Sequence, residues 1–228
     1  MRSTDGQNWA QVLNVPTTNN LNAVAWAGSS FIAVGDGGVV LSSANGLNWT
    51  ASLAAVAVST NTLNAIHCVG GDCVAVGTAG TTLWTTSAGA SWTLFTHGSN
   101  NWTAIAYGND DANADPPVVL QAGGVLSIYR TAIYINTWVV ADAQGNYAYA
   151  TSPGGWIDGN APIASSIVAI DYTTRFVALD AAGNAYASET ATSWLPVGST
   201  GLTSPTAIQS NGQGFVALGA LGTNASSF

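Results

Sequence analysis

The sequence has 228 residues and a net charge of −8, and only 6% of its residues are charged, against about a quarter in ordinary soluble proteins. The chain is long enough to bury a sizeable core. Because it has no Lys and three Arg, it has no basic face for a polyanion, which excludes a nucleic-acid partner. No apolar stretch approaches the ~20 residues of a membrane-spanning helix.

The chain begins with a turn signal, Ser3 to Trp9, and a motif of Ala followed by Val or Ile then recurs six times. The six pairs are Ala23-Val24, Ala65-Ile66, Ala104-Ile105, Ala132-Ile133, Ala169-Ile170 and Ala207-Ile208. A second apolar run follows each pair, a Gly then opens a third run, and four of the third runs lead to a turn ending in Trp. Each unit therefore predicts four short strands joined by tight turns.

The second runs are apolar at nearly every position, as in 31–35 and 176–180. This pattern is typical of a sheet that is covered on both faces, so the units must stack on one another. The sequence predicts a single all-β domain over 1–228, a β-propeller of about six four-stranded blades that start near 21, 63, 102, 130, 167 and 205.

The last unit stops before its fourth strand, and residues 1–20 contain the missing turn and strand. We therefore expect the N-terminal strand to complete the last blade and close the ring, which would hide two edge strands. The third unit is irregular, because it contains an insertion at 109–117 and reaches the next unit after 28 residues. The alternative is five full blades and a remnant.

Two segments, 31–38 and 3–9, resemble the Asp-box (BNR-like) propeller repeats of secreted bacterial proteins, sialidases and photosystem II assembly factors. The resemblance implies that an Asp braces the turn between the third and fourth strands of a blade, and that a Trp packs between blades. Asp5 keeps this acid and Asn45 replaces it in the next unit. The repeat Trp residues, which we interpret as structural, are Trp9, Trp49, Trp92, Trp156 and Trp194.

Cys68 and Cys73 flank a four-residue turn, at the positions that Trp26 and Phe31 occupy in the first unit. They should face each other across a hairpin, close enough to form a disulfide. A disulfide would indicate an oxidising compartment. Two reduced core cysteines are the alternative.

Asp111, Asn113 and Asp115 alternate within the insertion, as oxygen ligands do at the start of many Ca²⁺ loops. The turn Gly and the distal Glu of such loops are missing. The pattern gives a weak calcium candidate, with a solvated acidic loop as the alternative, and no other cofactor is expected.

Catalytic patterns are missing from the sequence. Arg2, Arg130 and Arg175 occupy unrelated places in the units, so they do not predict the Arg cluster of a sialidase. His67 and His97 are the two histidines, and no nucleophile-elbow sequence accompanies them. We expect that the protein is not an enzyme.

The expected function is an extracellular or cell-surface recognition or adhesion module that binds a glycan or a protein, with the periplasm as a further location. The low charge, the predicted disulfide and the abundance of Ser, Thr, Asn and Gly favour this function. The alternative is a scaffold that self-associates or packs into a larger complex or chain, as the resemblance to assembly-factor propellers implies.

Overall fold

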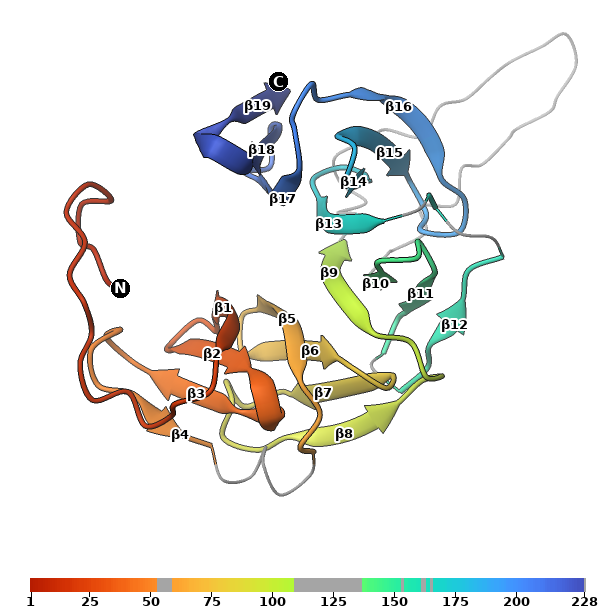
Figure 1. The fold of residues 1–228 in the computed structure, drawn as a ribbon. Coiled ribbons are helices and arrows are strands. Elements are labelled where there is room, and N and C mark those ends of the chain that lie inside the picture. Colours follow the sequence, from red (N-terminus) through yellow and green to blue (C-terminus); the bar gives the residue numbers. More distant parts are fainter. Residues whose placement is uncertain (53–58, 109–136, 153, 161–162, 165, 228) are drawn as a thin grey trace, which may run out of the picture.

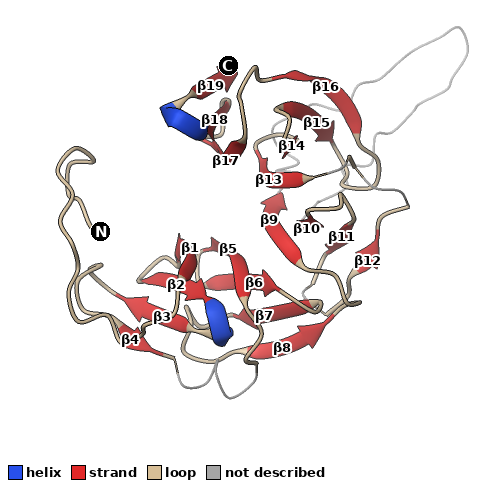
Figure 2. Ribbon diagram, in the orientation of Figure 1, coloured by secondary structure: helices blue, strands red, loops and turns tan. Residues whose placement is uncertain are grey.

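The computed structural model describes residues 1–52, 59–108, 137–152, 154–160, 163–164 and 166–227. These residues form five antiparallel sheets that follow one another along the chain and are arranged as an open arc (Figure 1). Strands dominate, with two short 3₁₀ turns at Asp36–Gly38 and Ala220–Gly222 (Figure 2). Among the described residues, no helix has the length and apolarity to cross a membrane.

We call the sheets blades I to V. Blade I contains β1 (Leu21–Trp26), β2 (Phe31–Gly35), β3 (Val40–Ser43) and β4 (Thr50–Ala51). Blade II contains β5 (Leu63–Val69), β6 (Asp72–Gly77), β7 (Thr81–Thr85) and β8 (Thr93–Thr96). Blade III contains β9 (Trp102–Gly108), β10 (Thr137–Asp142), β11 (Tyr147–Ala150) and β12 (Ile157–Asp158). Blade IV contains β13 (Ile167–Tyr172), β14 (Phe176–Asp180), β15 (Asn184–Ser188) and β16 (Leu195–Ser199). Blade V contains β17 (Pro205–Ser210), β18 (Phe215–Gly219) and β19 (Asn224–Ser227).

The first strand of each blade lies toward the middle of the arc and the last strand lies outside (Figure 1). The second strands of blades I to IV are largely buried on both faces, as the apolar runs predict, whereas β18 of blade V is partly exposed. In β6, for example, Cys73 and Ala75 pack toward blade I, while Val74 and Val76 pack toward blade III. The core is therefore a series of layers between blades rather than one central cluster.

Polar side chains also connect neighbouring blades. The Asn22 side-chain amide donates to the Leu63 carbonyl at 2.9 Å, and the equivalent Asn64 donates to the Trp102 carbonyl at 2.8 Å. The Asp171 carboxylate accepts from the backbone N–H of Ser210 and from the Gln209 side chain. These contacts fix the inner strands of adjacent blades against one another.

The prediction of six blades is wrong for the described residues, which form five sheets. The third and fourth predicted units belong to one blade, because β9 pairs directly with β10, with Tyr107 opposite Trp138. The Ala132-Ile133 pair falls in 109–136, between these two strands and outside the described residues. The predicted blade start near 130 therefore lies outside the described residues.

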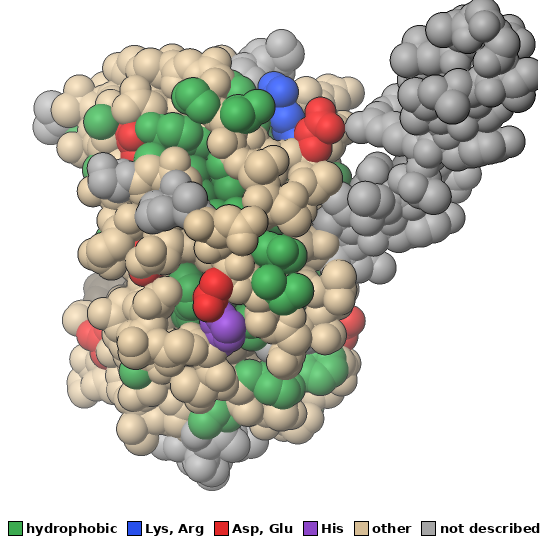
Figure 3. All heavy atoms as spheres, turned by 90° about the vertical axis from the view of Figure 1, so that its right-hand side faces the viewer, with side chains coloured by type: hydrophobic (Ala, Val, Ile, Leu, Met, Phe, Trp, Pro, Cys, Tyr) green, Lys and Arg blue, Asp and Glu red, His purple; other side chains and the backbone are tan. Residues whose placement is uncertain are grey.

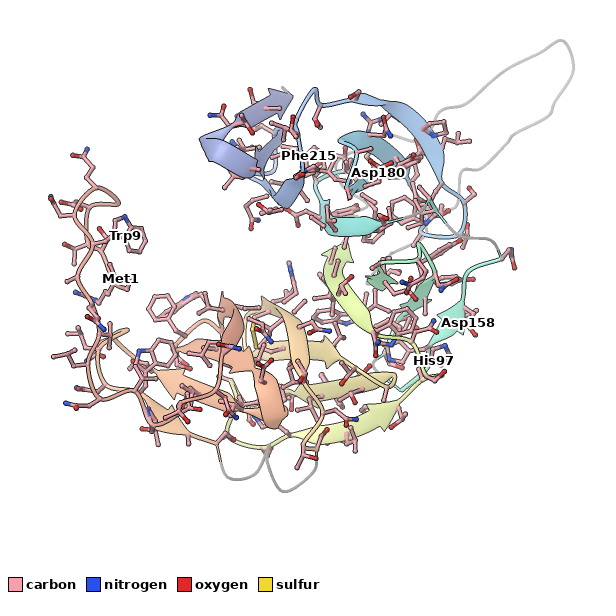
Figure 4. All side chains as sticks on the ribbon, in the orientation of Figure 1. Met1, Trp9, His97, Asp158, Asp180 and Phe215 are labelled. Carbon is pink, nitrogen blue, oxygen red and sulfur yellow. A yellow bond between two sulfur atoms is a disulfide. The ribbon has the colours of Figure 1, made fainter. Side chains whose placement is uncertain are left out.

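The prediction that residues 1–20 complete the last blade is also wrong. Blade V has three described strands, and Trp9 lies across an open side of the arc from Phe215 (Figure 4). The N-terminal residues contact blade I instead, because the Arg2 guanidinium donates to the Asn45 carbonyl at 3.0 Å. Complementary sequences at the two ends of the chain are therefore not sufficient to pair residues 1–20 with blade V.

Two apolar sheet faces are consequently exposed. On blade I, Val24 is 61% exposed and Trp26 is 48% exposed; on blade V, Val216 is 43% exposed and Leu218 is 51% exposed. These side chains lie on the faces that point away from the neighbouring blade, since Ala23 and Ala217 on the opposite faces pack into the core. Each end face is therefore exposed in part; on blade I, Ala33 and Leu41 lie on the same face as Val24 and are buried.

Candidate functional site

The turns that precede Trp9 and Trp49 share one hydrogen-bond pattern. The Asp5 carboxylate accepts from the backbone N–H groups of Gln7 and Asn8 at 2.9 and 2.8 Å. The Asn45 amide oxygen accepts in the same way from residues 47 and 48. Each Trp indole N–H then donates to the Gly carbonyl three residues earlier, at 3.2 Å. These hydrogen bonds to the ionised form hold the pKa of Asp5 well below its usual range.

The other repeat Trp residues lie between blades. Trp92 packs in the core between blades I and II, Trp156 packs against the core between II and III, and Trp194 against the core between III and IV. By contrast, Trp9 is 59% exposed. The structure thus places three of the five predicted Trp residues at blade interfaces.

A disulfide joins Cys68 and Cys73, as predicted from the hairpin. The equivalent pair of blade I, Trp26 and Phe31, is in edge-to-face contact with ring centroids 4.7 Å apart. The predicted calcium ligands Asp111, Asn113 and Asp115 lie outside the described residues. Within the described part of the chain, no group of three His, Cys, Asp or Glu side chains is placed to hold a metal ion.

An aromatic cavity of about 470 Å³ lies between blades II and III, and we call it the aromatic groove. Four rings line it, Trp84 on β7 and Phe95 on β8 of blade II, and Tyr107 on β9 and Trp138 on β10 of blade III. Polar groups also line it, namely the Asp72 carboxylate and the hydroxyls of Thr151 and Ser152. The volume falls within the ~300–1,000 Å³ typical of ligand sites in proteins.

Strand register explains how the rings converge. Side chains directly opposite in an antiparallel pair share one face of the sheet. Tyr107 is opposite Trp138, and their centroids are 4.7 Å apart. On blade II, Thr82 is opposite Phe95, and Trp84 lies two residues along the same face, with its ring centroid 6.3 Å from that of Phe95. Each blade therefore presents two rings to the other.

Gly154 of blade III allows the Phe95 ring of blade II to approach closely. A Cβ atom at Gly154 would lie 2.8 Å from the Phe95 ring, so this ring packs directly against the backbone of blade III. The contact connects the outer strand of blade II with the turn that follows β11. The groove is therefore bounded on this side by an inter-blade contact that a larger residue at position 154 would disturb.

The electrostatics of the groove are negative. Burial raises the pKa of the Tyr107 hydroxyl, and the nearby Asp72 carboxylate raises it further. Both effects make the Tyr107 hydroxyl harder to ionise than that of an ordinary Tyr. Within the described part of the chain, no Lys or Arg lines the groove.

A second polar contact joins the same two blades at their outer strands. His97 Nε2 lies 2.7 Å from an Asp158 carboxylate oxygen, and Figure 4 shows the two side chains facing each other. The His97 ring is stacked beside that of Trp102. The surface nearby carries few charged side chains, as Figure 3 shows for this side of the molecule.

Comparisons with known proteins agree with this architecture. No family model and no curated protein sequence matches the chain. Among solved structures, YCF48 bound to D1 peptide superposes with a TM-score of 0.65 at 14% identity, over 97% of this chain and 68% of that chain. The fold is a β-propeller.

Other propeller structures are similar at the same level. YCF48 from Cyanidioschyzon merolae gives a TM-score of 0.59 at 13% identity, over 95% of this chain and 69% of that one. PorZ, a surface component of the type-IX secretion system of Porphyromonas gingivalis, gives 0.56 at 12% identity, over 91% of this chain and 27% of that one. At these identities the likeness shows the propeller fold alone.

The propeller arrangement does not gather the described arginines. Arg2 lies beside the Asn45 turn, while Arg175 lines a cavity of about 310 Å³ between blades IV and V. Arg130 lies outside the described residues. The His67 ring contacts the Trp138 ring edge-on, with centroids 6.0 Å apart. His67 lies on β5, the inner strand of blade II, whereas His97 of the His97–Asp158 pair follows β8, the outer strand.

The aromatic groove was not predicted from the sequence. One signal was available, because Tyr107 and Trp138 occupy the same hairpin positions as Trp26 and Phe31. Recognising it required pairing β9 with β10 across 109–136. The six-unit prediction placed these two residues in different blades, so their pairing was overlooked.

Proposed function

We propose that this propeller is a non-catalytic recognition module that binds a peptide segment of a partner protein in the aromatic groove. The observation that supports this proposal is the convergence of four partly or fully buried rings, a carboxylate and two exposed hydroxyls in one cavity between blades. Aromatic residues supply large contact areas and are enriched at protein interfaces. A propeller of similar fold, YCF48, is known bound to D1 peptide, which makes a peptide ligand reasonable for this fold.

The proposal is tested by selecting peptides from a displayed random library against the full chain, followed by calorimetric titration of the selected peptides. Thr151 is exposed and makes no hydrogen bond through its side chain among the described residues. Thr151→Arg should fill the groove without altering the core, and we expect it to weaken binding about tenfold or more, equivalent to about 1.4 kcal/mol. Trp84→Ala should weaken binding similarly.

The matched control is Trp26→Ala, which removes a half-exposed ring on blade I, outside the groove. We expect it to change the affinity by less than about twofold. Thermal unfolding of each variant shows whether the fold is retained. Equal affinities of the wild type and Thr151→Arg would contradict the proposal, as would a glycan array on which a sugar binds in a Thr151-dependent way and no peptide competes.

We also propose that the protein works in an oxidising location, at the cell surface or outside the cell. The Cys68–Cys73 disulfide supports this location, because such bonds persist where thiols are not kept reduced. Thiol labelling of the protein from its native source, under denaturing and non-reducing conditions, is the test. Labelling of both cysteines would contradict it.

A second candidate function is assembly into a larger structure. The exposed faces of blades I and V, with Val24, Trp26, Val216 and Leu218, favour it, because contiguous exposed apolar faces are typical of interaction surfaces. Light scattering after size-exclusion chromatography should then detect an assembly that dissociates in the double variant Trp26→Ser/Leu218→Ser. A monomeric wild type in this measurement would remove self-assembly from consideration.

The turns at residues 3–9 and 43–49 support assignment to the Asp-box propellers, since an Asx side chain braces each turn and the following Trp closes it. We propose this subfamily for the chain. Asp5→Ala should detach the N-terminal turn and expose its amides to hydrogen exchange, while Asp158→Ala should leave that turn protected. Unchanged exchange in Asp5→Ala would contradict the bracing role.

A further inference from the structure

The described carboxylates of the chain differ in how the fold uses them. Asp5, Asp36, Asp142 and Asp180 brace turns through backbone or Asn donors. Asp171 binds the next blade, Asp158 pairs with His97, and Glu189 also has an interaction partner. Within the described residues, Asp72 is the carboxylate without a hydrogen bond or ion pair. It is exposed at the start of β6 and lines the aromatic groove.

The groove therefore combines an unpaired negative charge with the faces and edges of four aromatic rings. A cation near such rings is attracted by their quadrupoles, and a carboxylate in the same site adds direct charge attraction. The Asp72 charge reaches the ring cluster, because it contributes to the raised pKa of Tyr107. A planar guanidinium can stack on rings and bind a carboxylate through two N–H donors, which an ammonium cannot do.

Within the described residues, no Lys or Arg side chain lines this site. The chain has no Lys and three Arg, of which Arg130 lies outside the described residues. The two described arginines, Arg2 and Arg175, lie at the blade I turn and between blades IV and V. With a net charge of −8, the whole molecule also favours the approach of a positively charged partner.

The geometry points to a guanidinium-binding site in the aromatic groove, in which Asp72 and the rings of Trp84, Phe95, Tyr107 and Trp138 hold an Arg side chain of the bound peptide. This inference rests on the proposed function and specifies its ligand. It predicts that the partner segment is basic and contains at least one Arg. A neutral sugar would use the rings and hydroxyls of the same groove but would gain nothing from the charge of Asp72.

The test compares two small probes that differ in charge and hardly in shape, N-acetyl-arginine methylamide and N-acetyl-citrulline methylamide. Binding is followed through the indole ¹H–¹⁵N signals of Trp84 and Trp138 in the full-length protein. We expect the arginine probe to shift these two signals and to bind about tenfold more tightly than the citrulline probe, a difference of one ion pair. Raising the salt concentration from about 0.05 M to about 0.5 M should reduce this preference.

Asp72→Asn should remove the preference for arginine, so that both probes bind with the affinity of citrulline. The matched control is Asp158→Asn, which changes the net charge equally at a carboxylate that is 73% exposed and outside the groove. It should keep the preference. Equal binding of the two probes by the wild type, an unchanged preference in Asp72→Asn, or shifts confined to other Trp signals would each overturn the inference.

The outcomes separate this inference from the proposed function. If selected peptides bind in a Thr151→Arg-sensitive way but the two probes bind equally, the peptide groove stands and the guanidinium site is wrong. If the arginine probe binds through Asp72 but no peptide is selected, the cation site stands and the peptide-binding function is wrong.

Discussion

Replacement of Asp180 should reveal how much a single buried carboxylate contributes to a blade. Asp180 is 5% exposed and is the last residue of β14. It accepts hydrogen bonds from the backbone N–H groups of Ala182 and Asn184, from the Asn184 side chain and from the Tyr186 hydroxyl, all at 2.9 to 3.1 Å. The turn between the second and third strands of blade IV is thus built around one side chain.

The expected cost follows from these four donors. Ala182 is exposed, so water can replace the carboxylate there, whereas Asn184 and Tyr186 are half-buried. Asp180→Ala should therefore leave three donors poorly satisfied and lower the free energy of unfolding by about 3 kcal/mol. Asp180→Asn keeps one acceptor oxygen for the two backbone donors, so it should cost about 1–2 kcal/mol.

Acid unfolding gives a second measure of the same group. Burial acts to raise the pKa of Asp180, but the hydrogen bonds from Asn184, Tyr186 and Ala182 outweigh it and hold the pKa below its ordinary value of 3.8. A carboxyl group with a lowered folded-state pKa stabilises the fold fully above its unfolded pKa. This contribution is lost as the pH falls below 3.8 through the folded-state pKa. Asp180→Asn should therefore show a smaller loss of stability over that interval than the wild type.

Urea unfolding followed by Trp fluorescence, at neutral pH and in an acidic series, measures both effects, and a shifted midpoint at constant slope identifies a change in stability. Asp142 offers a comparison, because it accepts three corresponding bonds from the backbone N–H groups of Gln144 and Asn146 and from the Asn146 side chain, whereas Asp180 also accepts from the Tyr186 hydroxyl. An Asp180→Ala variant whose free energy of unfolding lies within about 1 kcal/mol of the wild type would contradict this role of the carboxylate. Equal destabilisation by Asp180→Asn and Asp180→Ala would also contradict it.

Three further predictions concern the blade interfaces and the hairpin of blade II. The double variant Cys68→Ser/Cys73→Ser should lose about 2 kcal/mol by chain entropy; reduced wild type should match it in thermal unfolding, and a variant as stable as the oxidised protein would contradict the estimate. Asn64→Ala removes the hydrogen bond to the Trp102 carbonyl of blade III and should lower the free energy of unfolding in urea by about 1–2 kcal/mol. The comparison is Asn61→Ala, because the Asn61 amide donates to the Thr81 hydroxyl within blade II and not to another blade. Burial lowers the pKa of His67, although the charge of Asp171 acts to raise it. The free energy of unfolding should therefore decline as the pH falls below 6.5, because the unfolded chain gains a proton there before the folded chain does. His67→Gln should flatten this decline, and a pH profile identical to that of the wild type would exclude a contribution of His67.

Local features of the blades could be predicted from the sequence. The Cys68–Cys73 pairing followed from comparing equivalent hairpin positions, and the structure contains that disulfide. The buried second strands followed from apolar residues at successive positions, since only a sheet covered on both faces tolerates them. Both predictions depend on contacts within one hairpin or one strand, where residues near in sequence are near in space.

The blade count required information that local patterns do not contain. Ala132-Ile133 matches the motif that starts other blades, so the spacing pattern treats it as a start. The strand that pairs with β9 is selected by side-chain packing, with Tyr107 against Trp138 and Ile105 opposite Val140. The pairing of β9 with β10 joins strands that are separated by residues 109–136, and counting repeated motifs cannot predict such a long-range pairing.

The aromatic groove also depends on long-range pairing, so the sequence did not predict it. Its four rings come from four strands in two blades, and each aromatic residue alone is typical of an ordinary strand. Asp72 reads as a turn residue, because Gly70, Gly71 and Asp72 form a typical hairpin turn. Its different role emerges when the partners of the other described carboxylates are known.

The use of the carboxylates also limits how this protein can recognise a charged partner. Asp142, Asp171 and Asp180 are buried and have their oxygens occupied by donors within the fold. They contribute to the long-range field of a chain with net charge −8, which accelerates the approach of a cation, but they cannot form a new close ion pair without breaking the turn or interface they hold. Within the aromatic groove, close contact with a partner cation therefore falls to Asp72, the described carboxylate that lines it. Because the rings supply the remaining attraction whatever the ionic strength, salt should mainly slow association. The dissociation rate should change little, so the affinity should fall by about the same factor as the association rate.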